Sequence, residues 1–236
     1  MGKTAVLFSG GKDSMLALML AKKAGHADLL ISTVSSAGGD TQLHLAPEVS
    51  PVARKTQIAL LKMPYQQVVI NPQDNYLWQV FQELRSIVRS EGLTELVTGD
   101  LWNPYTGGLN DMLAGALNVK LWRPCRELCP SQEKSSEYMQ KIIESGIEAV
   151  VVAVKKDILP YKYVGKKIDA KFLEEIQEQK SDCAGEEGQY QSFVVNSPLM
   201  KGKIQFGDFS VYEVSARNGR GTFYRLDTSD ILSVSL

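Results

Sequence analysis

The sequence is poor in cysteine and histidine and almost without net charge. Its 236 residues include only 3 Cys and 2 His, and 26 basic side chains balance 27 acidic ones to a net charge of -1. So few cysteines cannot form a disulfide framework and are typical of a reducing compartment, so we expect a cytoplasmic protein. A near-neutral chain lacks the general positive field that attracts nucleic acid or anionic lipid, which argues against a DNA-binding or membrane-surface protein.

Long apolar runs are also missing. No stretch approaches the roughly 18 to 20 residues of a transmembrane helix, and the apolar residues 5–8 are too few for a signal-peptide core. Cys125 and Cys129 are spaced like part of a zinc site, but the two histidines show no finger spacing, so we interpret both cysteines as inert. With 44% hydrophobic residues, the chain can bury the core of one large or two small domains.

The first half alternates short aliphatic runs with amphipathic helical patterns, which is typical of strand–helix units on a parallel sheet. Strands are expected at 4–8, 29–34, 68–70, 95–98 and 119–121. Helices are expected at 13–24, 51–61, 74–89 and 112–117. We therefore predict an α/β domain over 1–129, with a Rossmann-like, parallel five-strand sheet and helices on both faces. Trp78 and Phe81, at helical spacing, are most simply explained as core residues.

The pattern changes after residue 129, and we expect a smaller α+β domain over 130–236. Helices are predicted at 131–145 and 169–179, with Ser131 and Asp169 as caps. Strands are predicted at 149–154, 203–206, 211–216 and 222–226. Asn218-Gly219 is typical of a type I′ turn between the last two strands.

A glycine-rich turn, Ser9-Gly10-Gly11-Lys12-Asp13-Ser14, follows the first strand and opens the first helix. Helix N-termini have unsatisfied amides and a positive dipole, so a tight glycine turn there makes an anion site. Lys12 adds charge and the two serines add hydroxyl donors, whereas Asp13 is unexpected unless it holds Mg²⁺ or orients the turn. The spacing fits neither a Walker A loop nor a dinucleotide fingerprint. From these residues alone, a plain glycine connection with a surface lysine stays open.

The hexapeptide resembles the pyrophosphate loop (PP-loop) of the N-type ATP pyrophosphatases, which have the adenine nucleotide alpha hydrolase type of fold. These enzymes adenylate an acceptor oxygen and release pyrophosphate. Further segments narrow the resemblance to the diphthine–ammonia ligase family. In chain order they are Thr33-Val34-Ser35, His44, Gly99-Asp100, Leu121-Trp122, Val164-Gly165-Lys166, residues 184–190, Phe193-Val194, Pro198-Leu199 and Lys203-Ile204.

The resemblance implies an AMP-forming ligase that adenylates an acceptor carboxylate and amidates it with ammonia or an amine. The N-terminal domain would bind ATP and the C-terminal domain would complete the acceptor site. The implied ATP site consists of Ser9, Gly10, Gly11, Lys12, Asp13, Ser14, Thr33, Val34, Ser35, His44, Gly99 and Asp100. The implied catalytic residues are Lys12, Asp13, Glu186 and Glu187, with Asp13 and Asp100 as Mg²⁺ ligands. The acceptor would be the diphthine of elongation factor 2 only in an archaeal or eukaryotic source.

Two segments depart from the family pattern. Gln189 and Gln191 stand where acidic residues are typical, and residues 106–111 lack the two arginines expected after Gly99. A changed acceptor is therefore expected. Two other functions stay open, a PP-loop tRNA-modifying enzyme and a non-catalytic ATP- or AMP-binding regulator. The oligomeric state also stays open, between a monomer and a homodimer.

Several of these residues also have plainer explanations. His44 could be an ordinary loop residue and Asp100 a helix cap. Glu186 and Glu187 could form a solvated acidic turn, although a carboxylate beside an attacking amine would take its proton. The lysines between 155 and 171 could form an exposed face, or a binding surface for RNA or an acidic protein.

Overall fold

The computed structural model describes residues 2–35, 50–71, 75–179, 181–215, 221–228 and 230–235. The chain divides into two compact units, of which the first comprises Met1–Ser9, Asp13–Leu45 and Met63–Pro130. The second comprises Gly10–Lys12, Ala46–Lys62 and Ser131–Leu236. These units differ from the expected domains, 1–129 and 130–236, because two N-terminal segments group with the C-terminal part.

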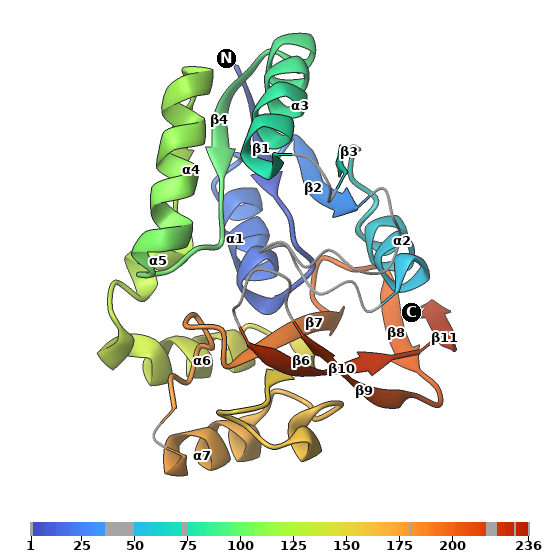
Figure 1. Ribbon diagram of the computed structural model, residues 1–236. Helices are drawn as coiled ribbons and strands as arrows, with labels where there is room; N and C mark the ends of the chain where they lie inside the picture. Colours follow the sequence, from blue (N-terminus) through green and yellow to red (C-terminus); the bar gives the residue numbers. More distant parts are fainter. Residues whose placement is uncertain are drawn as a thin grey trace. The chain divides into compact units, whose positions relative to one another are not determined.

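The first unit is built on a five-stranded sheet (Figure 1). Its strands are β1 (Lys3–Leu7), β2 (Leu29–Ser35), β3 (Tyr65–Ile70), β4 (Leu93–Val97) and β5 (Lys120–Trp122). They lie in the order β3-β2-β1-β4-β5, and every pair is parallel. The predicted Rossmann-like sheet is thus confirmed. Because β1 and β4 are neighbours, the strand order reverses between them.

Helices of the first unit cover both faces of this sheet. They are α1 (Lys12–Lys23), α3 (Tyr76–Glu91), α4 (Pro104–Leu117) and α5 (Pro124–Leu128). Apolar side chains of α3 and α4 share one core cluster with alternate residues of the strands, among them Val80, Leu84, Ile87, Leu113, Ala5, Leu29 and Ile31. The chain crosses from β1 to β2 in one direction and from β3 to β4 in the other. Since such crossovers are right-handed, α1 lies on the opposite face from α3.

Helix α3 shows where the sequence pattern predicted well and where it did not. The helix begins after Asn75, whose side chain accepts a hydrogen bond from the Trp78 amide at 3.1 Å, and it ends at Gly92 in the left-handed conformation. Trp78 was expected in the core, but it is 60% exposed. At 3.6 residues per turn, Trp78 lies opposite the buried Ile87, so this part of the prediction is wrong.

Helix α4 begins earlier than expected, at Pro104 rather than at residue 112. Proline is favourable at the first position of a helix because its missing N–H has no partner there. The pair Gly107-Gly108 weakens the helical pattern in the sequence, which explains the late start that we predicted. No described helix is both apolar enough and long enough to span a membrane.

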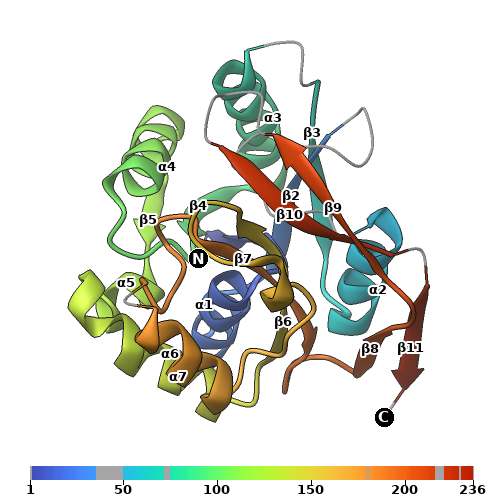
Figure 2. The ribbon, with the colours of Figure 1, turned by 60° about the horizontal axis from the view of Figure 1, so that its bottom comes forward.

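The second unit combines helices with antiparallel strands (Figure 2). Its helices are α2 (Pro51–Leu61), α6 (Ser135–Glu144) and α7 (Ala170–Glu178). Its strands are β6 (Glu148–Lys155), β7 (Tyr190–Asn196), β8 (Gly202–Phe206), β9 (Ser210–Ser215), β10 (Thr222–Asp227) and β11 (Ile231–Ser235). They form a sheet of order β7-β6-β10-β9 and a separate β11-β8 pair, so the α+β prediction is confirmed.

Of the two helix caps predicted in this unit, the structure confirms one. Asp169 accepts a hydrogen bond from the Phe172 amide at 2.9 Å, so its predicted role as the cap of α7 is confirmed. The Ser131 side chain makes no cap hydrogen bond, and a 3-10 turn over Gln132–Lys134 separates it from α6, so its predicted role as a helix cap is wrong. The predicted turn at Asn218-Gly219 lies outside the described residues.

Glu148, at the start of β6, makes a pH-dependent contribution to the stability of the second unit. Its carboxylate accepts hydrogen bonds from Lys203 at 2.5 Å and Asn196 at 2.7 Å, which lower the pKa of Glu148. A lowered folded-state pKa stabilises the fold above the unfolded-state pKa, and this stability is lost as pH falls through the folded-state value. Because the pair is partly exposed, we expect Glu148→Gln to lower the free energy of unfolding at pH 7 by only about 0.5 kcal/mol.

Urea unfolding at pH 7 and at pH 3 checks this expectation. The difference between Glu148→Gln and the wild type should be smaller at pH 3 than at pH 7, because the stability that this carboxylate contributes is lost as pH falls from its unfolded-state pKa toward its lowered folded-state pKa. Glu174→Gln on the exposed surface of α7 is the control and should change stability at neither pH. An effect of Glu148→Gln that is equal at both pH values would contradict the role of the charge.

Candidate functional site

Most of the predicted ATP-site residues of the first unit follow the carboxyl ends of its parallel strands. Ser9 follows β1, Thr33 and Val34 lie near the end of β2, and Gly99-Asp100 follows β4. Open α/β sheets bind ligands at this edge, at the point where the strand order reverses, which here lies between β1 and β4. The fold therefore gathers these residues at one edge. His44 lies outside the described residues.

Gly99 lies against the first turn of α1. A Cβ atom at Gly99 would be 2.6 Å from the carbonyl carbon of Asp13 and 2.7 Å from the amide nitrogen of Ser14. Ser9 Oγ donates a hydrogen bond to Ser14 Oγ at 3.0 Å across the same turn. The approach of two backbones thus requires glycine, and the end of β4 sets the position at which α1 begins.

Thr98 precedes Gly99 and was not recognised in the sequence. The residue is 2% exposed, and its hydroxyl has no hydrogen-bond partner among the described residues. A buried hydroxyl without a partner costs free energy, and such groups often meet a ligand or water. Its position directly after β4 is the only signal in the sequence that could have found it.

Asp100 is held by an arginine. One carboxylate oxygen accepts a hydrogen bond from Arg123 Nε at 2.6 Å, the other accepts one from Asn110 at 2.9 Å, and the side chain is 6% exposed. Arg123 also pairs with Asp111 at 2.8 Å and donates to the Gly107 carbonyl. Burial by itself would lower the pKa of Arg123, but its hydrogen bonds to the two aspartates outweigh burial and raise that pKa.

This arrangement does not fit a Mg²⁺ ion on Asp100. Each oxygen of its carboxylate accepts a hydrogen bond, one from Arg123 and one from Asn110, so a Mg²⁺ ion here would lie against the positive charge of the guanidinium. Within the described part of the chain, no three His, Cys, Asp or Glu side chains form a group that could hold a metal ion. Arg123 also supplies a guanidinium to residues 106–111, the segment that lacks the arginines typical of the family.

The centre of the glycine turn belongs to the second unit, where α2 and β7 hold it. The Gly10 carbonyl accepts hydrogen bonds from the Val194 amide at 2.9 Å and from Gln57 Nε2 at 3.0 Å. Gln57 Nε2 also donates to the Val194 carbonyl at 2.7 Å. Gly10 has a φ of 83°, and a Cβ there would be 2.5 Å from Gln57 Oε1. The conformation of the turn thus depends on glycine at position 10 and on a glutamine that the sequence did not reveal.

Lys12 is buried and tied to the turn before β7. The residue is 3% exposed, and its Nζ atom donates to the Ala184 carbonyl at 2.6 Å. The same ammonium lies 5.3 Å from the centre of the Tyr190 ring, while the Lys12 amide donates to Ser192 Oγ at 3.2 Å. A buried ammonium is tolerated only where such acceptors surround it. Lys12 is therefore not the surface lysine that remained open from the sequence.

Asp182 orders the turn that carries Glu186 and Glu187. Its buried carboxylate accepts hydrogen bonds from the backbone amides of Ala184 at 2.9 Å, Glu186 at 2.6 Å and Glu187 at 3.4 Å. Glu187 stays exposed and accepts a hydrogen bond from Gln189 Nε2 at 3.2 Å. The structure thus ties Lys12, through the Ala184 carbonyl, to the turn that carries the two glutamates. Asp182 was missed because nothing in its local sequence distinguishes it from a surface aspartate.

Comparisons with known proteins point to one family. The model for the diphthamide synthase N-terminal domain matches residues 2–70, and the model for its C-terminal domain matches residues 134–220. The diphthine–ammonia ligases of Homo sapiens and Bos taurus are each 23% identical over 228 residues, covering 86% of this chain and 82% of the relative.

A solved structure described as a predicted subunit of tRNA methyltransferase from Methanocaldococcus jannaschii shows a weaker likeness. It is 13% identical, covers 84% of this chain and 98% of that chain, and has a TM-score of 0.43. So low a score carries no argument about function. The two domain models, by contrast, occur in family order and together match more than half of the chain. The chain belongs to the diphthine–ammonia ligase family, whose members are ATP-dependent ligases that form C–N bonds.

Proposed function

We propose that this protein adenylates a carboxylate with ATP and then amidates it with ammonia or an amine. The observation that carries the proposal is the buried Lys12 in a glycine turn at the start of α1. The β- and γ-phosphates of ATP would bind the turn amides and the Lys12 ammonium, because both present positive charge to the same anion. Gly99 would admit the α-phosphate beside this turn.

In the first step, a carboxylate oxygen of the acceptor attacks the α-phosphorus. The bond to the β-phosphate breaks, pyrophosphate leaves, and an acyl adenylate forms. In the second step, the nitrogen of ammonia attacks the acyl carbon, AMP leaves, and a nearby base takes the surplus proton. Glu186 and Glu187 are proposed for that base, with Asp182 as the residue that positions their turn. Asp13, and not Asp100, is the aspartate proposed to contact the Mg²⁺ that accompanies ATP.

The acceptor would be diphthine of elongation factor 2 in an archaeal or eukaryotic source, and another carboxylate elsewhere. Gln189 is buried beside Glu187, and its Oε1 atom has no hydrogen-bond partner among the described residues. An amide here makes the turn less negative than the acidic residue typical of the family. The neutral amide of Gln189 therefore favours an acceptor that contacts this turn through an uncharged group.

Product analysis with ATP labelled at the α-phosphate tests the proposed function. The wild type is incubated with Mg²⁺ and a host-cell extract as acceptor pool, with and without ammonium. We expect AMP, formed faster when ammonium is added, and a new amide in the acceptor that carries the nitrogen label when the ammonium is labelled. Formation of ADP, or tight ATP binding without any turnover, would overturn the proposal and favour a non-catalytic regulator.

A further inference from the structure

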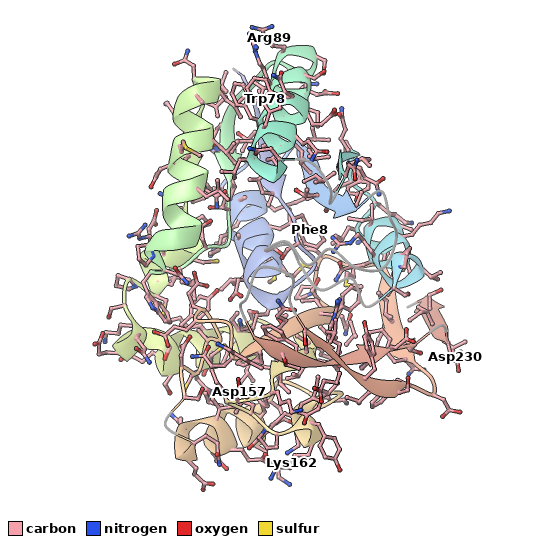
Figure 3. All side chains as sticks on the ribbon, in the orientation of Figure 1. Phe8, Trp78, Arg89, Asp157, Lys162 and Asp230 are labelled. Atoms are coloured by element: carbon pink, nitrogen blue, oxygen red, sulfur yellow. The ribbon has the colours of Figure 1, made fainter. Side chains whose placement is uncertain are left out.

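The outer face of α3 carries features that the proposed function does not use. Trp78, Gln82, Arg85 and Arg89 are spaced by three or four residues, so they form one stripe along the helix. Trp78 is 60% exposed, and both arginines are exposed. Figure 3 labels Trp78 and Arg89 on this helix. One exposed aromatic side chain and two exposed cations thus share one stripe of α3, and the proposed function uses none of them.

A shallow hollow lies at the C-terminal part of this stripe. It is lined by Gln82, Arg85, Ser86, Arg89 and Ser90. Ser90 Oγ donates to the Ile87 carbonyl at 3.2 Å, so its hydroxyl proton is used within the helix. The other four side chains can donate hydrogen bonds, and two of them carry a fixed positive charge. No carboxylate lines the hollow, so it is complementary to an oxyanion with several acceptor atoms, above all a phosphate.

The two arginines are available for such an anion. Neither makes an ion pair within the described part of the chain, and the Arg85 guanidinium lies 6.0 Å from the centre of the Phe81 ring. Of the acidic residues on α3, Glu91 is paired with Lys3 at 2.9 Å and accepts a hydrogen bond from Gln66. Glu83 lies about 100° or more around the helix from the stripe, so it does not neutralise the hollow.

Besides the two arginines, Trp78 gives the outer face of α3 a second feature that could bind a ligand. Its ring lies 5.9 Å from the Phe81 ring at an interplanar angle of 32°, so the two rings form a small aromatic platform. Two helical turns, about 10.5 Å, separate Trp78 from Arg85 along the axis, which is the size of a nucleoside and its phosphate. Bases stack on exposed aromatic rings while arginines bind the backbone.

We propose that the outer face of α3 binds single-stranded RNA, with phosphate groups at Arg85 and Arg89 and a base stacked on Trp78. The surface is independent of the ATP site, because none of its residues belongs to the proposed ligase machinery. An acidic polypeptide is the competing occupant, but it would use the arginines and would not need a stacking platform. The two occupants therefore differ in their dependence on Trp78.

Binding of a fluorescein-labelled ten-residue oligouridylate, measured by fluorescence anisotropy, tests this proposal. With about two phosphates neutralised, the logarithm of the association constant should fall with the logarithm of the salt concentration with a slope of about -1.4. The double variant Arg85→Gln, Arg89→Gln should weaken binding at least tenfold and remove most of the salt dependence. Trp78→Ala should weaken binding about fivefold or more while keeping the slope.

The matched control is Lys162→Gln, Lys171→Gln, which removes two exposed charges from the lysine-rich segment of the second unit. It should leave the affinity within about twofold, and equal melting temperatures should show that all variants fold. Three results would overturn the proposal. They are no binding of the oligonucleotide by the wild type, equal loss in the lysine control, or displacement of the RNA by a ten-residue glutamate peptide at the same concentration as by unlabelled RNA.

Discussion

Replacing Lys12 with methionine is expected to lower the rate of AMP formation by about 100-fold to 1,000-fold, the usual cost of removing one donor to a developing anion. In the structure, the Lys12 ammonium donates to the neutral carbonyl of Ala184 at 2.6 Å. A phosphate oxygen of ATP is a charged and therefore stronger acceptor, so the ammonium would exchange one partner for a better one. Methionine keeps the length and the apolar volume of the side chain, and the fold should survive.

The control for Lys12→Met is Lys22→Met, which lies exposed in the last turn of the same helix. It should leave the rate within about twofold. Initial rates with α-labelled ATP give the effect on catalysis, and urea unfolding gives the effect on stability. If Lys12 only held the turn at Ala184, the variant would lose stability and its folded fraction would keep the wild-type rate. That outcome would contradict the proposed role in phosphate binding.

The parts of the site that the sequence revealed are those fixed within a few residues. The turn at 9–14 is recognisable because one strand, two glycines and one helix follow one another directly. The parallel sheet was predicted for a similar reason, since alternating strand and helix patterns are typical of strand–helix units on a parallel sheet. Trp78 was misplaced because apolar residues at helical spacing do not tell which of them reaches the core.

The parts of the site that the sequence did not reveal are contacts between residues far apart in the chain. Gln57 holds Gly10 across 47 positions, and the Lys12 ammonium meets the Ala184 carbonyl across 172 positions. No local pattern encodes such a pairing. Asp100 makes the same point, because no local pattern shows that its carboxylate pairs with Arg123, 23 positions away.

Gly99→Ala is expected to disrupt the start of α1 and with it the turn that we propose binds phosphate. The new methyl group would lie 2.6 Å from the Asp13 carbonyl carbon and 2.8 Å from the Asp13 carbonyl oxygen. These are backbone atoms, so no change of rotamer relieves the contact, and either β4 or α1 must move. Overpacking of this kind typically costs about 1–3 kcal/mol in the free energy of unfolding.

Gly115→Ala separates this steric effect from a general effect of replacing glycine. Gly115 lies in α4, and no atom lies within 4 Å of the position that its Cβ would take. Alanine there should raise the free energy of unfolding by about 0.5–1 kcal/mol, because glycine is unfavourable inside a helix. The two substitutions should thus change stability in opposite directions, and only Gly99→Ala should weaken the stabilisation of the protein by ATP in thermal unfolding. Equal ATP stabilisation in the two variants would show that the contact between Gly99 and α1 does not set the geometry of the nucleotide site.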